Sequence, residues 1–284
     1  MFLYGQTKSG MDMIRINNMA VRVGCYLILL MGTISWPLTV AYAQNFDEFG
    51  TTEEQFTSLQ ILDIPTAAVV SRGTAIITLR VLSRGGLLSS IHAGVSDRFL
   101  LGISFGGSNI IGTGDINWNP RPEVAIKYLM LGETETLPAL AVGFESQGYG
   151  SYNNTLNRYQ IKARGFYGVL SRNFSLAGTF GMHAGVNYSI ENKDKDDRLN
   201  VFIGADKSIN PHLTFLIEYD FARNDSQSLP GFGRDKGYLN IGARITLGDR
   251  VGLEFDLRNL LDNRVGTISP SRELRILYSE PFDF

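Results

Sequence analysis

The sequence has little of what crosslinks or anchors many exported proteins. Its 284 residues include a single cysteine, Cys25, and the formal net charge is −2. Cys25 lies within the first 43 residues, which have the pattern of a leader, so we expect a mature chain without disulfides or thiolate metal sites. The small negative charge gives no electrostatic basis for nucleic-acid binding. After residue 43 no apolar run approaches the ~18 residues of a membrane helix, so a membrane form of this chain has to be a closed β-barrel.

The leader has the features of a secretory signal peptide. A basic region precedes an apolar run that begins at Cys25, and Ala-Tyr-Ala, ending at Ala43, is typical of a cleavage site. An uncleaved N-terminal anchor is the alternative, because the apolar run is near spanning length. We predict a signal peptide over residues 1–43, a periplasmic lead-in arm over 44–72 and an outer-membrane barrel over 73–284. The basic residues of the leader are Lys8, Arg15 and Arg22.

The clearest structural signal is a hairpin pattern near the C-terminus. Apolar residues occupy every second position from Leu239 to Leu247 and, after Gly248-Asp249, again from Val251 to Leu257. Successive side chains of a strand point to opposite faces, so each segment has one apolar and one polar face. Gly-Asp is typical of a two-residue hairpin turn. The polar face carries Arg, Glu and Asp, which is typical of a barrel with lipid outside and a polar interior.

Similar segments along the chain predict about twelve strands, an even number, as single-chain bacterial barrels prefer. Most have the ~9 to 11 residues that a tilted membrane strand needs. The fold class is therefore all-β, a closed antiparallel transmembrane barrel, with a soluble β-sandwich as the alternative. The predicted strands are Thr74–Ser83, Leu87–Ser96, Arg98–Phe105, Glu123–Leu131, Leu137–Ser146, Arg158–Leu170, Ser175–Ile190, Arg198–Lys207, His212–Ala222, Tyr238–Leu247, Arg250–Arg258 and Arg272–Glu280.

Loop lengths sort by position in the chain. Links after even-numbered strands are short, such as Asp97 and Gly248-Asp249, whereas most links after odd-numbered strands are long, such as Gly106–Pro122 and Arg223–Gly237. The first link, Arg84–Gly86, is the exception. Outer-membrane barrels have short periplasmic turns and long extracellular loops, and a soluble sandwich has no reason for such sorting. We therefore expect the short rim and both chain termini to face the periplasm.

Charged residues fall on the parity opposite to the apolar one, and we predict that they face the barrel lumen. Both signs occur, so ion pairs can link these residues across the interior, and a wide selective channel is not required. A small passive diffusion pore is the alternative function that this polar interior suggests. The predicted lumen-facing residues are Lys127, Glu145, Lys162, Arg164, His183, Glu218, Asp220, Arg244, Glu254, Asp256, Arg258 and Arg275.

The motifs predict no catalytic, cofactor or metal site. The glycine-rich stretch Gly106–Gly114 lacks the Gly-Lys-Ser/Thr of a phosphate loop, and we interpret it as a barrel loop. His92 and His183 both occur in His-Ala-Gly-Val, which two strands with inward polar residues explain more simply than a metal or catalytic pair. We predict that the protein is not an enzyme. An outer-membrane enzyme acting on lipids is the second alternative, and it depends on these two histidines.

Several segments resemble the YjbH-like family of bacterial outer-membrane proteins. The resemblance covers most of the mature chain, and its motifs are structural. It implies an outer-membrane β-barrel in a Gram-negative bacterium, supporting exopolysaccharide production or export, or envelope structure. The segments are LDIPTA (Leu62 to Ala67), GISFGGSNIIGTG (Gly102 to Gly114), NPRPEVAIKY (Asn119 to Tyr128), LPALAVGFESQGYG (Leu137 to Gly150), GFYGVLSRNF (Gly165 to Phe174) and LEFDLRNLLDN…RELRILY (Leu253 to Tyr278).

The expected partners depend on the predicted localisation in the outer membrane. They are outer-membrane lipid, the barrel-assembly machinery during insertion and polysaccharide-export components, whereas nucleic acid is not expected. The chain ends in the aromatic residues Tyr278, Phe282 and Phe284, which are compatible with the terminal-strand signal by which such barrels are assembled.

Overall fold

The computed structural model describes residues 57–227, 229–267 and 269–282, and the predicted signal peptide lies outside these residues. Within them the chain forms β-strands and one short 3-10 turn, η1 (Ser83–Gly85). No helix in this part of the chain is both long and apolar enough to cross a membrane. The described chain is therefore all-β.

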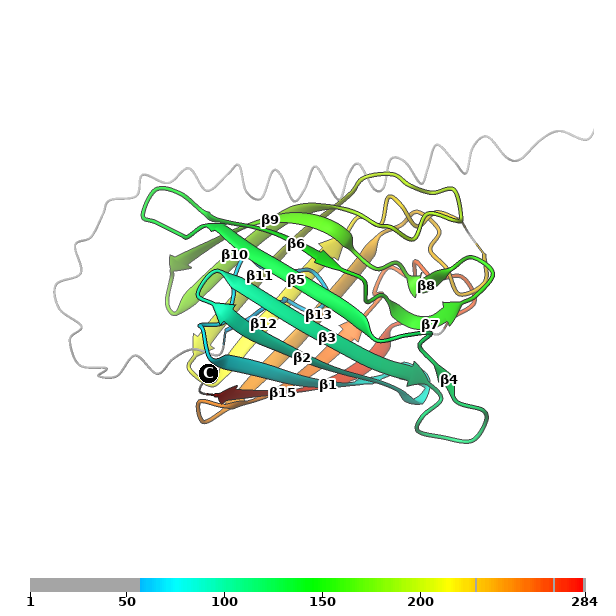
Figure 1. Cartoon of the computed structure of the whole chain (residues 1–284), viewed down its shortest axis with the longest axis horizontal. Coiled ribbons are helices and arrows are strands. Elements are labelled where there is room, and N and C mark those ends of the chain that lie inside the picture. The colour runs from blue at the N-terminus through cyan, green and yellow to red at the C-terminus, as the bar shows by residue number, and fades with distance from the viewer. Residues whose placement is uncertain (1–56, 228, 268, 283–284) are drawn as a thin grey trace, which may run out of the picture. The chain divides into compact units, whose positions relative to one another are not determined.

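Twelve strands form one closed antiparallel ring, as the alternation predicts. These strands are β1 (Thr74–Leu82), β2 (Gly86–Ser96), β3 (Phe99–Ser108), β5 (Glu123–Leu131), β6 (Ala139–Glu145), β9 (Gly165–Ser175), β10 (Thr179–Tyr188), β11 (Asn200–Asn210), β12 (Leu213–Asp220), β13 (Tyr238–Leu247), β14 (Val251–Arg258) and β15 (Ser271–Pro281). The ring closes where β1 pairs with β15, with Thr74 opposite Pro281 (Figure 1). The closed antiparallel barrel that the sequence predicts is thus confirmed.

Three further strands lie outside the ring. β4 (Asn117–Trp118) is a short extension beside the end of β3. β7 (Tyr149–Asn153) and β8 (Arg158–Ile161) form a separate hairpin. Figure 1 shows this hairpin at the end of the barrel where the long loops gather.

The outer face of the ring carries the apolar parity. In β12, Phe215 and Ile217 are 47% and 48% exposed, whereas their inward neighbours Leu216 and Glu218 are 3% and 1% exposed. Such a surface is costly in water, whereas hydrocarbon accommodates it, and the closed ring leaves no unpaired strand edge. The fold is therefore a transmembrane β-barrel. Other apolar residues of the ring strands, and Phe221 directly after β12, are also exposed: Leu101, Ile103, Phe105, Val124, Ile126, Tyr128, Met130 and Tyr278.

The connections are short at one rim and long at the other, as the sequence predicts. Gly248 in the β13–β14 turn has φ +62°, the left-handed conformation that glycine adopts readily in tight hairpins. The turn η1 lies at the long-loop rim and is again the exception. The short turns are residues 97–98, 132–138, 176–178, 211–212 and 248–250, and the long loops are 109–122, 146–164, 189–199, 221–237 and 259–270.

One predicted strand, Arg158–Leu170, is wrong because the segment forms two separate elements. Its first four residues are β8 of the outer hairpin, and the ring strand β9 begins only at Gly165. Between them the Ala163 N–H donates to the Glu191 carboxylate instead of to a neighbouring strand. Gly165 has φ +66°, which interrupts an extended run. Lys162, predicted to face the lumen, therefore lies among the long loops.

The lipid-facing belt gives a prediction about depth. Ile217 lies in the middle of β12 and Leu247 at the short-turn end of β13, and they are 48% and 52% exposed. We expect Ile217→Lys to lower the free energy of unfolding by about 2–4 kcal/mol and Leu247→Lys by about 0–1 kcal/mol, because a cation costs most at the bilayer midplane. Reversible denaturant unfolding in lipid vesicles measures both. Equal losses would contradict the placement of the belt.

Candidate functional site: a plugged lumen

Residues 58–68, which we call the plug, lie inside the barrel. The segment belongs to the predicted periplasmic lead-in arm, for which the sequence leaves open whether it fills the lumen. Ile61, Leu62 and Ile64 are completely buried, because outside the barrel these apolar side chains would have no core to join. They pack, together with Ala67, against inward apolar side chains of the ring strands: Ala141, Tyr167, Val169, Phe202 and Leu216.

One carboxylate of the wall holds the middle of the plug. The backbone N–H groups of Leu62, Asp63 and Ile64 all donate to Glu218 Oε2, at 3.0, 2.8 and 3.0 Å. Three successive N–H groups that converge in this way form a concave anion site. The other oxygen, Glu218 Oε1, accepts from Asn240 Nδ2 at 2.7 Å. The Glu218 side chain, on β12, is thus fully engaged and fixes the plug to the wall.

Cations of the wall bind the plug's carbonyl oxygens. Lys127 Nζ, on β5, donates to the carbonyls of Leu59, Thr66 and Ala68 at 2.9, 3.0 and 3.0 Å. Arg164 Nε donates to the Asp63 carbonyl at 3.1 Å. The plug is neither helix nor strand, so its buried backbone groups need such side-chain partners. Arg244 and Arg275 likewise donate to carbonyls of the plug, those of Ile61 and Leu62.

The side chain of Asp63 extends the contact into a buried ionic cluster. It pairs with Arg80 of β1 at 2.9 Å and with Arg258 of β14. Glu273 of β15 pairs with the same two arginines, at 3.2 and 2.6 Å. Removing one member of such a cluster leaves an uncompensated buried charge. A second buried group forms where Glu254 of β14 pairs with Arg244 and Arg275, at 2.6 and 3.0 Å.

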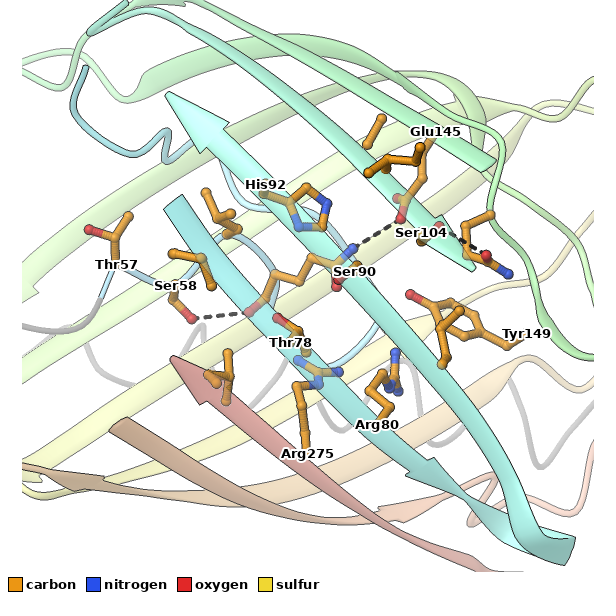
Figure 2. A pocket seen from close by; sticks show the side chains of 18 of the residues that line it. Thr57, Ser58, Thr78, Arg80, Ser90, His92, Ser104, Glu145, Tyr149 and Arg275 are labelled. Atoms are coloured by element: carbon orange, nitrogen blue, oxygen red, sulfur yellow. Dashed lines mark hydrogen bonds between the residues drawn. The ribbon is translucent and has the colours of Figure 1, made fainter. Parts of the chain in front are cut away.

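Little space remains beside the plug. A cavity of about 50 Å³ lies between the plug and a wall that includes Thr78, Ser90 and Ser104, and Figure 2 shows the side chains that line it. It has room for about one or two water molecules, at ~30 Å³ per liquid water. Tyr149 lines this cavity and also a second one of about 170 Å³ nearer the long-loop rim. The guanidinium groups of Arg80 and Arg258 lie 4.6 and 5.1 Å from the Tyr149 ring centre.

Three lumen residues form a hydrogen-bonded chain of serine, histidine and aspartate. His183 Nδ1 lies 2.7 Å from Ser171 Oγ, and His183 Nε2 lies 2.8 Å from Asp206 Oδ1. These residue types occur together in serine hydrolases. Here, however, Ser171 Oγ accepts the Ala67 N–H of the plug at 2.8 Å, and the serine is only 5% exposed. The three hydrogen-bonded residues therefore anchor the end of the plug.

A second polar layer covers the long-loop rim. Arg158 of β8 is completely buried and pairs with Asp194 at 2.6 Å and Asp225 at 2.8 Å, from two different long loops. Lys162 also pairs with Asp194, at 2.8 Å. Tyr159 Oη donates to Glu123 Oε1 at 3.1 Å, which ties the hairpin to β5. These contacts hold the β7–β8 hairpin against the ends of the ring strands.

The structure places the residues predicted to face the lumen in two groups. Lys162 belongs to the long-loop layer, and the others are buried within the ring or, for Arg164, at its edge: Lys127, Glu145, Arg164, His183, Glu218, Asp220, Arg244, Glu254, Asp256, Arg258 and Arg275. Sequence reasoning missed Arg80 and Glu273, which share the inward parity of β1 and β15 and could have been found by that signal. The sequence around Asp63 has no pattern that predicts its ion pairs with Arg80 and Arg258.

These observations define the class of protein: a transmembrane β-barrel of twelve strands whose lumen is filled by its own N-terminal segment. No protein-family model and no curated protein matches the sequence. Among solved structures, the chain is similar to the KdgM porin at 11% identity and a TM-score of 0.45, covering 74% of this chain and 99% of that one. It is also similar to the NanC porin, at 11% identity and TM-score 0.41, covering 74% and 100%. Outer membrane protein Omp33 of Acinetobacter baumannii gives 8% identity and TM-score 0.41, covering 74% and 97%.

The long-loop layer predicts a pH dependence. Burial raises the pKa of Glu191 to about 7, and the N–H groups of Ala163 and Tyr159 oppose this only in part. Because the pKa of Glu191 is higher in the folded protein than in the unfolded chain, this carboxyl contributes its full stability at pH values below the ordinary pKa of glutamate. That contribution is lost as the pH rises through about 7. We expect thermal unfolding in detergent to show lower stability at pH 8 than at pH 5, and Glu191→Gln to remove most of this difference.

Asp196 in the same layer supplies the control. Burial raises its pKa, but hydrogen bonds from Arg198 and Ser226 outweigh burial and lower it to about 2. Its contribution is therefore constant between pH 5 and pH 8 and is lost only in stronger acid. Asp196→Asn should lower stability equally at both pH values. A pH dependence that Glu191→Gln leaves unchanged would contradict the assignment to Glu191.

Proposed function

We propose that the protein is a pore of the bacterial outer membrane that its own plug holds closed. The plug inside the lumen is the observation that carries this proposal. The side chains of an eight-stranded barrel are roughly sufficient to fill its interior, and barrel diameter grows with strand number. A ring of twelve strands leaves more space. The plug occupies that space, and water would occupy it if the plug left.

The chemistry of the wall supports a hydrated open state. The groups that bind the plug include a carboxylate, an ammonium and guanidinium groups, on Glu218, Lys127 and Arg164. Water solvates all three kinds of group, so plug release exchanges protein hydrogen bonds for hydrogen bonds to water. An apolar wall would instead resist wetting. No covalent bond in the described part of the chain joins the plug to the wall beyond the main chain itself, so release leaves the ring strands paired.

The loops support an orientation. Long loops lie outside the cell and short turns face the periplasm in barrels of this class. In that orientation the start of β1 and the end of β15 lie on the periplasmic side, because both are at the short-turn rim. The plug then enters the lumen from the periplasm. Outer-membrane lipid and, during insertion, the barrel-assembly machinery are the partners that this placement requires.

Two other functions have less support. The described residues add no observation to the exopolysaccharide role that the family resemblance implies. The Ser171–His183–Asp206 chain is the feature that favours a lipid-acting enzyme, but its hydroxyl is buried under the plug, on the side of β9 opposite to the lipid-facing surface. We therefore propose a protein without enzymatic activity.

Planar-bilayer recording of the refolded protein tests the proposal. We expect the wild type to be closed for most of the time. Glu218→Ala removes the acceptor of three plug N–H groups, and losing ~2 kcal/mol of charge-assisted hydrogen bonding shifts the closed-to-open ratio roughly 30-fold toward the open state. A double variant, Leu62→Ser with Ile64→Ser, weakens the plug without altering the wall and should shift the ratio in the same direction.

Leu176→Ser is the matched control, because Leu176 is an exposed turn residue at the short-turn rim. It should leave the recordings unchanged. Circular dichroism verifies that each variant retains the barrel. Folded variants that stay as silent as the wild type would contradict a pore, and a wild type that conducts as freely as the variants would contradict closure by the plug.

A further inference from the structure

The cavity of about 170 Å³ near the long-loop rim, named the mouth pocket, is lined by no residue of the plug, although it shares Arg258 and Glu273 with the cluster around Asp63. It lies between the turn after β1, the β7–β8 hairpin and the loop that follows β14. At ~30 Å³ per liquid water, this volume is room for on the order of six waters. A pocket of that size can hold one ring-sized organic group, but it is too small for several linked units of a polymer.

The mouth pocket carries an excess of positive charge. Arg84, Arg258 and Arg264 line it, with Glu273 as the acidic residue. Glu273 is already paired with Arg258 and with Arg80. Arg264 has no ion pair among the described residues, and its Nε is buried without a hydrogen-bond partner there. Arg84 is exposed on the turn at the edge of the pocket.

The surroundings of Arg264 make its positive charge energetically unfavourable in the absence of an anion. Burial lowers the pKa of Arg264, and the neighbouring cations Arg258 and Arg84 lower it further, against the opposing effect of Tyr238 and Glu273. The guanidinium remains charged, because its ordinary pKa is far above neutral. An anion placed beside it would offset both the burial and the like-charge repulsion.

The rest of the wall suits a hydroxylated molecule. Gln160, Ser83 and Ser271 line the mouth pocket, and their side chains both donate and accept hydrogen bonds. The rings of Tyr149 and Tyr238 supply flat surface. Pockets that bind small polar molecules combine aromatic surface with a few placed polar groups in this way.

We propose that the mouth pocket binds a small anion, a carboxylate or phosphate group carried on a hydroxylated body, with Arg264 as its principal partner. A guanidinium group binds either oxyanion through two parallel hydrogen bonds. Tyr149 separates this site from the cavity beside the plug, since it lines both. The site is therefore placed where a solute from the long-loop side first meets the closed lumen. It exists in the closed barrel and does not depend on the plug's release.

Titration calorimetry of the refolded mature chain in detergent tests the proposal with three probes. Gluconate carries a carboxylate, glucose 6-phosphate carries a phosphate, and glucose carries neither. We expect at least one anion to bind roughly tenfold or more tightly than glucose, with binding that weakens as salt is added. The anion that binds more tightly identifies the charged group of the ligand, and either result supports the site.

Variants locate the site. Arg264→Gln should weaken anion binding roughly tenfold or more, and Arg84→Gln should weaken it less, because Arg84 is exposed. Arg84 is exposed on the turn after β1, so Arg84→Gln should fold. This second variant therefore remains informative if Arg264→Gln fails to fold. Arg250→Gln removes the same charge from the short-turn rim, where Arg250 pairs with Glu280, and should leave binding unchanged.

Three results overturn the proposal: no binding of either anion, binding of glucose as tight as that of the anions, or unchanged anion binding in both Arg264→Gln and Arg84→Gln. The measurement needs no conductance. An anion that binds to a barrel that never opens would therefore support this site while contradicting the pore, and a pore without anion binding would do the reverse.

Discussion

Three backbone N–H groups of the plug meet at one oxygen of Glu218, and most of the interior is arranged around that contact. The plug has one isolated β-bridge of its own, between Gln60 and Pro65, and otherwise lacks the hydrogen bonds of a helix or a sheet. Its buried backbone groups would each cost free energy without partners. The wall therefore supplies a carboxylate for the N–H groups and cations such as Lys127 for the carbonyl groups. Charges of both signs inside the barrel result from that requirement.

In the proposed function, the same charges allow two states of the barrel. When the plug is in place, Asp63 completes a buried cluster with Arg80 and Arg258, and each charge has an opposite neighbour. When it is absent, water can solvate the same side chains. A wall built from leucine and valine would bind an apolar plug as well, but it would not tolerate water in its place. The polar wall is therefore compatible with the proposed pore, in which closure by the plug is reversible.

The two ends of the barrel differ in a related way. Short turns at one rim leave few side chains to interact with a solute, whereas the long loops at the other rim form their own polar layer around Arg158. That layer narrows the entrance and leaves the mouth pocket at its edge. The charges within the layer are mostly paired, and Arg264 is a cation that has no ion pair in the described part of the chain.

The sequence by itself determined most of the strands, their faces and the sorting of loops. Alternation has a period of two residues and is read within one segment, so β5 and β13 begin and end at the predicted residues. Arg80 and Glu273 carried the same local signal. The tertiary structure alone decided the rest. The apolar run around Leu62 reads as an arm because its partners, such as Phe202 and Glu218, lie far along the chain. Likewise, Ser171, His183 and Asp206 come from three different strands, and only ring closure and strand register bring them and the plug together.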